Sequence, residues 1–337
     1  MSLKNDTVQG SVKDTSKLLT KTTPMANLDT LFKKFDNELN ITKTKKDALM
    51  RSKNNLRDEI RDYFSKNHPD YSPKFYIQGS YKLKTLIRTK DDTCDLDDGV
   101  YFNENPDEVT ATTLQRWVKD AVDGTTDATP EHKKKCIRVD FKAGYNIDLP
   151  VFVFDEETED HPNLAVKNIG FQTDDPKEFV NEFKKSKTDQ KVRMVKYLKS
   201  WCDHKRHDMP SGLAMTVLTM KHFQPNTRDD IALKFLLIEI EKELRKSFRC
   251  VMPTTPKDNL FQNYTETKES NFMLNLSTFI DDAKLAIDEK NILKASKLWK
   301  KHLGDRFPEG EDKDEELNSA AKLIPTIGAS RPYFSFE

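Results

Sequence analysis

Three aspartates and one small turn are the residues of this chain best suited to chemistry. Asp95 and Asp97 lie two positions apart in an apolar run, and Asp148 lies in a second such run. Side chains two apart in a strand share a face, about 6.5–7 Å apart. Carboxylates on an apolar strand are costly to bury unless a cation pairs with them. The trio therefore predicts a site for divalent metal, with Mg²⁺ as the expected ion and Mn²⁺ as the alternative.

The turn lies upstream of the aspartates, in the sequence Gln78-Gly79-Ser80. A strand that ends in Gly-Ser and opens a helix presents free backbone N–H groups and a hydroxyl, which suits a phosphate. The alternative is a turn glycine followed by an N-cap serine. Taken with the aspartates, the turn predicts a site for nucleoside triphosphate, with pyrophosphate as the leaving group. Asp148 would bind the metal nearest the attacking hydroxyl and accept its proton.

Two further residues are weaker candidates for triphosphate contacts. Lys196 lies in a run that mixes basic residues with an apolar stripe, and Ser211 follows Met209-Pro210 at an expected helix start. Each has an alternative role, in a solvated basic face or as an N-cap. Asp98 is expected on the opposite strand face, as a turn or surface carboxylate. Asp140, beside Arg138 in a more polar run, is expected at the surface.

Composition limits the class of protein. The chain has 337 residues with Lys+Arg and Asp+Glu equal at 56 each, so affinity for polyanions must come from local clusters. No apolar run approaches the ~20 residues of a membrane helix, and the N-terminus has no apolar block typical of a secretory signal. The four cysteines are scattered, which predicts reduced thiols and a cytoplasmic protein. A zinc site at Cys202–His207 lacks the paired ligands of structural sites.

The elements that must position these residues follow from periodicity. A long or broken helix is expected over 25–66, and strands over 74–78, 96–102, 136–141 and 145–154, the last two forming a hairpin. Helices dominate from about residue 176. The predicted fold is α/β (α+β), a nucleotidyltransferase lobe with a mixed sheet and then a helical lobe, with the active site between them. The expected boundaries are a disordered 1–22, a nucleotidyltransferase core 23–175, a helical lobe 176–310 and a tail 311–337.

The order Gly79-Ser80, Asp95-Leu96-Asp97 and Asp148 resembles the cGAS/DncV-like nucleotidyltransferases, the CD-NTases of bacterial CBASS anti-phage signalling. The run around Lys196 resembles their triphosphate-binding lysine helix, and Ser211 falls where a phosphate-contacting serine is expected. The resemblance implies that the first lobe is Pol β-like. It also implies template-independent synthesis of a cyclic di- or trinucleotide from triphosphates such as ATP and GTP. That product would activate a partner effector.

Two departures from the family pattern bear on activation and on partners. There is no Cys/His zinc insertion, so activation by nucleic acid is not expected. The tail ends in Phe336-Glu337 rather than the small residue expected for conjugation by an E1/E2-like partner, which leaves that partner open. Two alternatives to cyclic synthesis also remain open. One is a linear nucleotidyltransferase acting on RNA ends through the basic segment 184–206, and the other is an inactive nucleotide-binding scaffold. The bases and the linkage of the product are not encoded in any single motif.

Overall fold

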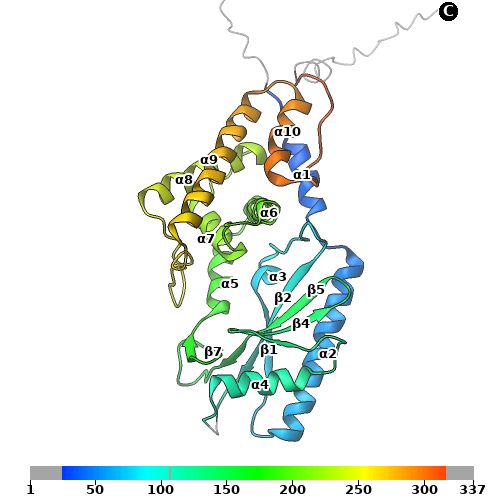
Figure 1. Cartoon of the computed structure of the whole chain (residues 1–337), viewed down its shortest axis with the longest axis vertical. Coiled ribbons are helices and arrows are strands. Elements are labelled where there is room, and N and C mark those ends of the chain that lie inside the picture. The colour runs from blue at the N-terminus through cyan, green and yellow to red at the C-terminus, as the bar shows by residue number, and fades with distance from the viewer. Residues whose placement is uncertain (1–24, 106–107, 316–337) are drawn as a thin grey trace, which may run out of the picture.

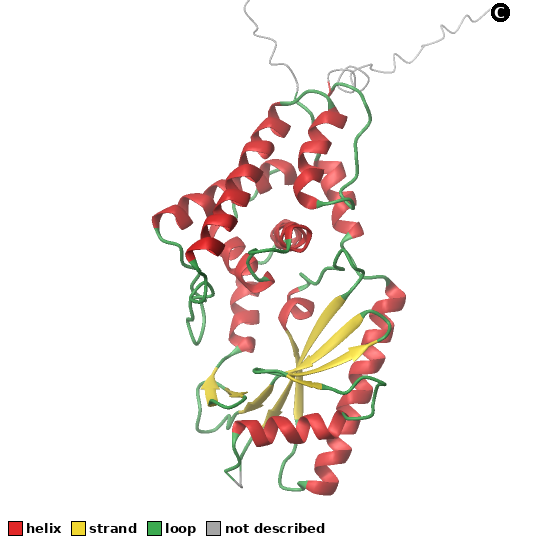
Figure 2. Ribbon diagram, in the orientation of Figure 1, coloured by secondary structure: helices red, strands yellow, loops and turns green. Residues whose placement is uncertain are grey.

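The protein has two lobes stacked along its longest axis (Figure 1). The structure, a computed structural model, describes residues 25–105 and 108–315. The lower lobe in the view contains a twisted sheet, and the upper lobe consists of helices, as Figure 2 shows by colour. The disorder expected over 1–22 and the tail after residue 315, with its possible conjugation, lie outside the described residues.

The first lobe contains both strands and helices, and the second lobe consists of helices. The strands are β1 (Lys74–Gln78), β2 (Cys94–Phe102), β3 (Glu131–His132), β4 (Ile137–Phe141), β5 (Tyr145–Leu149), β6 (Val151–Val153), β7 (Asn163–Val166) and β8 (Gly170–Thr173). The helices are α1 (Asp29–Glu38), α2 (Lys43–Asn67), α3 (Gly79–Leu83), α4 (Ala111–Val122), α5 (Pro176–Lys185), α6 (Asp189–Lys205), α7 (Gly212–His222), α8 (Asp229–Lys246), α9 (Glu266–Asp288) and α10 (Ile292–Leu303).

Strand β2 is the central element of the sheet. One edge pairs antiparallel with β1, and the other pairs in parallel first with β5 and then with β6. The sheet is therefore mixed, as predicted, and the β4–β5 hairpin is antiparallel. Leu96 and Val100 on β2 are fully buried in one core with residues of α2 and α4. Helix α4 is absent from the sequence prediction, although Leu114 and Val118 have helical spacing.

The expected long helix at the N-terminus is broken in two. Thr42 starts the second piece, because its side chain accepts a hydrogen bond from Lys45 N at 3.2 Å and caps α2. Helix α2 packs on the sheet, whereas Phe32 and Phe35 of α1 lie in the core of the helical lobe. Phe32 makes edge-to-face contacts with Trp299 and Phe307, far along the chain. The packing boundary between the lobes therefore falls between α1 and α2, and not only near residue 175.

Asp98 does not lie at the surface as predicted. Its side chain is fully buried on the core face of β2, where the guanidinium of Arg57 from α2 donates to both carboxylate oxygens, the Nε–Oδ2 distance being 2.7 Å. Strand alternation places Asp98 opposite Asp97, and an apolar core accepts a carboxylate when a charge is paired with it. The arginine that satisfies it is 41 positions away, so the strand sequence alone gives no indication of the pair.

We expect Arg57→Ala to lower the free energy of unfolding by about 3 kcal/mol, because it leaves the Asp98 carboxylate buried and unpaired. The matched control is Arg61→Ala on the same helix. Arg61 also lies over the Phe75 ring, but its partner Asp58 is exposed. This control should cost about 0.5 kcal/mol or less. Urea unfolding of both variants measures the difference, and equal losses would contradict the assignment.

Candidate active site

The sheet register brings the three predicted carboxylates to one face. Asp97 on β2 is the direct parallel partner of Asp148 on β5, and Asp95 is the partner of Asn146. Partners in adjacent strands project to the same face, with the strands about 4.8 Å apart. Asn146 donates from its amide to Asp95 Oδ1 at 2.9 Å. Asp140 on β4 is exposed, in line with the surface position predicted for it.

Electrostatic repulsion and burial act on this group. Burial raises the pKa of Asp97 to about 6, and the neighbouring Asp148 and Asp95 carboxylates add to the shift. Burial also raises the pKa of Asp95, against the opposing effect of Arg138. Raised pKa values mean that the positive charges and hydrogen bonds of the protein do not fully stabilise the ionised carboxylates. A divalent cation would supply it, and oxygen ligands of this kind suit Mg²⁺ or Mn²⁺.

Arg138 holds the third carboxylate in place. Its guanidinium donates from Nε and Nη2 to the two oxygens of Asp148, at 2.7 and 2.6 Å. This bidentate pair fixes the Asp148 carboxylate toward β4. The three carboxylates meet on one face, but their oxygens are not drawn together around a single point. Among the described residues, the tight metal-ligand cluster lies elsewhere, at His161, Asp175 and Glu178.

The Gly-Ser turn lies directly against Asp97. Gly79 has a φ of +59°, and a Cβ built on it would lie 1.9 Å from Asp97 Oδ2, so this position requires glycine. The preceding Gln78 is buried and accepts a hydrogen bond from the Tyr101 hydroxyl at 3.1 Å. Ser80 lines two cavities that lie beside this turn. A phosphate at this turn would therefore lie next to the metal-binding face.

Two cavities flank the turn. Asp97 lines the first, of about 350 Å³, and Asp95 lines the second, of about 340 Å³. Ser80, Lys199 and Gly212 line both. Each volume falls in the range that small-molecule ligands occupy. The walls come from the sheet lobe and from α6 and α7, so the cleft lies between the lobes as predicted.

Lys196 and Lys199 lie three positions apart on α6. Lys199 lines this cleft, whereas Lys196 does not. Lys196 is buried against α1, where its ammonium donates to the carboxylate of Asp36 and to Asn40 Oδ1. Lys199 is half-buried and donates to the Thr85 carbonyl at 2.9 Å. Burial lowers the pKa of Lys199 to about 8, against the opposing attraction of Asp97 and Asp95.

Sequence reasoning missed Lys199 for a physical reason. Helix α6 is buried on most of its circumference, so its apolar positions do not define one outward face. The partner that engages Lys196 lies on α1, 160 positions away. Ser211, the other weak candidate, caps α7 by accepting a hydrogen bond from Ala214 N at 3.2 Å. It is exposed beside Gly212 and lines neither of the two cavities.

Comparison with known proteins finds a family that resembles part of the sheet lobe. Residues 73–152 match the family described as "Cyclic GMP-AMP synthase DncV-like, nucleotidyltransferase domain". This segment contains the Gly-Ser turn and all three aspartates. Over this segment the chain is similar to the DncV-like nucleotidyltransferases. The curated cyclic GMP-AMP synthase of Escherichia albertii is 28% identical over 211 residues, which are 57% of this chain. That alignment spans 45% of the relative's length.

Solved structures of DncV proteins share the fold of this chain along most of its length. The cyclic AMP-GMP synthase DncV of Vibrio cholerae superposes with a TM-score of 0.73 at 17% identity, covering 84% of this chain and 98% of that one. The Escherichia coli DncV bound to 3'-deoxy GTP gives 0.69 at 18% identity, covering 80% and 93%. The predicted fold, a lobe with a mixed sheet followed by a helical lobe, is therefore confirmed. Within the described residues, no helix has the length and apolarity needed to cross a membrane.

Proposed function

We propose that this chain joins nucleoside triphosphates into a cyclic di- or trinucleotide in the cleft between its lobes. The observation that carries the proposal is the register of β2 and β5, which sets Asp95, Asp97 and Asp148 on one face beneath the Gly79-Ser80 turn. The match of this same segment to the DncV-like nucleotidyltransferase domain supports it. Structures of Vibrio cholerae DncV with bound GTP, and with ATP and GTP, also support it.

In the proposed reaction, Asp95 and Asp97 hold divalent metal, Mg²⁺ or Mn²⁺, which would neutralise phosphate charge and activate the attacking hydroxyl. The Gly79 backbone and the Ser80 hydroxyl orient the phosphates, and Lys199 contributes a point charge to the triphosphate. Asp148 accepts the proton of the attacking ribose hydroxyl. That oxygen forms a bond to the α-phosphorus as the bond to pyrophosphate breaks. A second transfer within the linear product closes the ring.

The cleft provides two compartments for two nucleotides. The cavity beside Asp97 and the cavity beside Asp95 share the wall formed by Ser80, Lys199 and Gly212. One cavity would hold the donor triphosphate and the other the acceptor, so that the attacking hydroxyl meets the α-phosphate near the shared wall. Positioning two reactants in one cleft is a large part of what such a catalyst must do. We further propose that the product activates a partner effector in cytoplasmic anti-phage defence.

The alternative of RNA-end extension loses its main sequence argument. The segment 184–206 was its proposed basic groove, but several of its charges are paired inside the protein. Arg193 donates to both oxygens of Asp229, and Lys196 is held by Asp36. Charges that are already paired and buried are poorly placed to bind a phosphate backbone. We therefore favour a reaction between free triphosphates over one that extends an RNA.

The test is the reaction product of the purified full-length chain. The protein is incubated with all four labelled triphosphates and Mg²⁺ or Mn²⁺, treated with phosphatase and analysed by mass spectrometry. A cyclic product resists phosphatase because it has no terminal phosphate, so resistant label with a cyclic mass is expected. A parallel reaction contains an RNA primer. Products that form only on the primer, or that remain phosphatase-sensitive throughout, would overturn the proposal in favour of the linear enzyme.

A further inference from the structure

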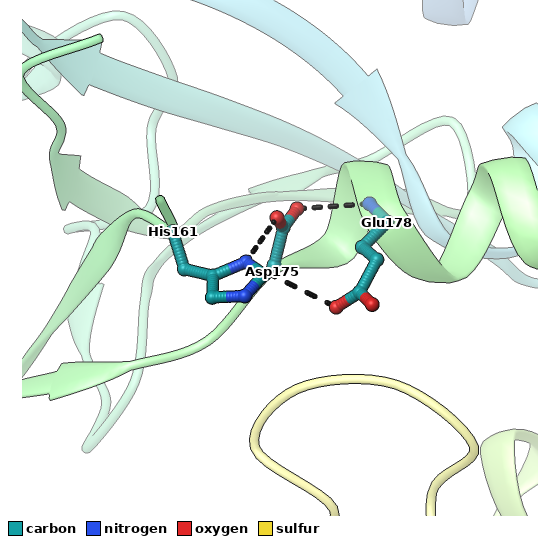
Figure 3. Close-up of side chains that lie close together, drawn as sticks. All are labelled: His161, Asp175 and Glu178. Carbon is teal, nitrogen blue, oxygen red and sulfur yellow. Dashed lines mark hydrogen bonds and ion pairs between the residues drawn. The ribbon is translucent and has the colours of Figure 1, made fainter. Parts of the chain in front are cut away.

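A histidine and two carboxylates meet outside the catalytic face, at the start of α5. His161 comes from the connection between β6 and β7, Asp175 is the N-cap of α5, and Glu178 lies in its first turn. Figure 3 shows the three side chains converging, with the loop after α8 below them in the view. One potential ligand atom from each residue lies within 4.8 Å of the other two. The cluster thus unites two segments of the chain at one point.

The distances are close to those of a coordination sphere. His161 Nδ1 lies 3.0 Å from Asp175 Oδ2 and 4.0 Å from Glu178 Oε2. Tetrahedral ligands with bonds of about 2.1 Å are roughly 3.4 Å apart. Shifts of less than about 1 Å in flexible side chains would bring the three atoms around one ion. Three ligands from the protein leave a fourth position for water.

Hydrogen bonds to neighbouring groups orient the three side chains. Asp175 Oδ1 accepts a hydrogen bond from Glu178 N at 2.8 Å, which leaves Oδ2 directed at the histidine. His161 Nε2 lies 3.2 Å from the Thr255 hydroxyl, and Thr255 N donates to Glu178 Oε2 at 2.9 Å. In the structure Nδ1 donates to Asp175 Oδ2. A metal would take the place of that proton, and Nε2 would then donate to the Thr255 hydroxyl. Such outer contacts orient the ligands of metal sites.

Charge and access also suit a cation. With a neutral imidazole the three side chains carry two negative charges. The side chains of His161 and Glu178 are 34% and 40% exposed, whereas that of Asp175 is 12% exposed. An ion can therefore enter from solvent and be held against a more enclosed carboxylate. A nitrogen ligand beside two carboxylates favours Zn²⁺ and similar transition metals, because Mg²⁺ is bound through oxygen.

We propose that His161, Asp175 and Glu178 form a site for one Zn²⁺-class divalent metal, separate from the metals of nucleotidyl transfer. Thr255 connects this site to the loop after α8, and Met252 of the same loop lines the first cavity together with Asp175. A bound ion would draw Glu178 and His161 together beneath Thr255. It would thereby fix the loop against α5 and stiffen one wall of the cleft.

The experiment uses the full chain carrying Asp95→Asn and Asp97→Asn, which removes two of the three carboxylates expected at the catalytic metal site. Zn²⁺ binding is followed by calorimetry, and Co²⁺ binding by its visible absorption. We expect one equivalent to bind, with an affinity at least about 100-fold weaker after His161→Ala, since that change removes a direct ligand. His207→Ala, which removes an exposed histidine elsewhere, is the matched control and should bind as the parent does.

Glu178→Gln gives a second, milder test, because it keeps the shape of the side chain and removes its charge. Weaker Zn²⁺ binding with an unchanged fold by circular dichroism supports the site. Zn²⁺ should also slow amide hydrogen exchange in the segment 250–259 of the parent but not of His161→Ala. The cluster is a hydrogen-bonded contact only if the Asp95→Asn, Asp97→Asn protein fails to bind Zn²⁺. The same conclusion holds if adding His161→Ala leaves its Zn²⁺ affinity unchanged. These readouts do not require turnover, so they stand apart from the test of the proposed function.

Discussion

Replacing Asp95 and Asp97 together with asparagine is expected to lower cyclic nucleotide synthesis by about three orders of magnitude or more. The change keeps the size of both side chains and removes the charges proposed to hold divalent metal. Loss of about 4 kcal/mol of transition-state stabilisation corresponds to a thousandfold in rate, which is within the reach of a metal contribution. Quantification of phosphatase-resistant product from labelled triphosphates measures the effect.

Asp140→Asn is the matched control for this double variant. Asp140 is an exposed aspartate on β4, and β5 separates that strand from β2. Its replacement should leave synthesis within about twofold, because it lines neither cavity. A double variant that retains the rate of the parent would refute the metal assignment.

Misfolding is not expected to explain the loss. The pKa of Asp97 is raised in the folded protein, so its charged form destabilises the fold. Metal-free parent protein should therefore lose stability as the pH rises from its unfolded pKa near 4 through about 6. The asparagine variant lacks this penalty. Its thermal midpoint at pH 7.5 without metal should equal or exceed that of the parent.

The second large effect is expected at Lys199. Lys199→Ala should lower kcat/KM for triphosphate by about 10- to 100-fold, since a hydrogen bond to a charged group contributes about 1.5–3 kcal/mol. Lys196→Ala, three positions away, should behave differently. It leaves Asp36 without its buried partner, so it should mainly lower the free energy of unfolding. Activity per folded molecule should then stay close to that of the parent.

This pair of variants separates the cleft lysine from the structural one. Steady-state kinetics and urea unfolding of both proteins form the experiment. If Lys196→Ala loses kcat/KM while Lys199→Ala does not, the original sequence assignment of Lys196 to the triphosphate is restored and the geometric one fails.

The same lysine predicts a pH dependence. Because the pKa of Lys199 is lowered to about 8, the free enzyme loses this positive charge as the pH rises above that value. We expect kcat/KM to fall on the alkaline side with an apparent pKa near 8. Lys199→Arg keeps its charge at all accessible pH values, so it should flatten this limb. An unchanged alkaline limb in the arginine variant would show that another group titrates there.

Local sequence was sufficient to predict the parts of the site that depend on the strands. Alternation along β2 put Asp95 and Asp97 on one face, and the apolar run around Asp148 defined β5. Gly79 was recognisable because a left-handed φ and close approach to another group exclude other residues. These features depend on a few neighbouring residues, whose backbone geometry and burial leave a visible period in the sequence.

Tertiary structure decided the rest, because it depends on partners far along the chain. Asp98 looked like a surface residue until Arg57 of α2 was found beside it in the core. Lys196 and Lys199 are equivalent as basic residues on α6, and only the packing of α1 against that helix turns one inward and leaves the other in the cleft. The break between α1 and α2, which sends the two helices to different lobes, has the same origin. Charge pairs and helix packing depend on which residues lie close together in the folded chain. The spacing of residues along the sequence does not predict these contacts.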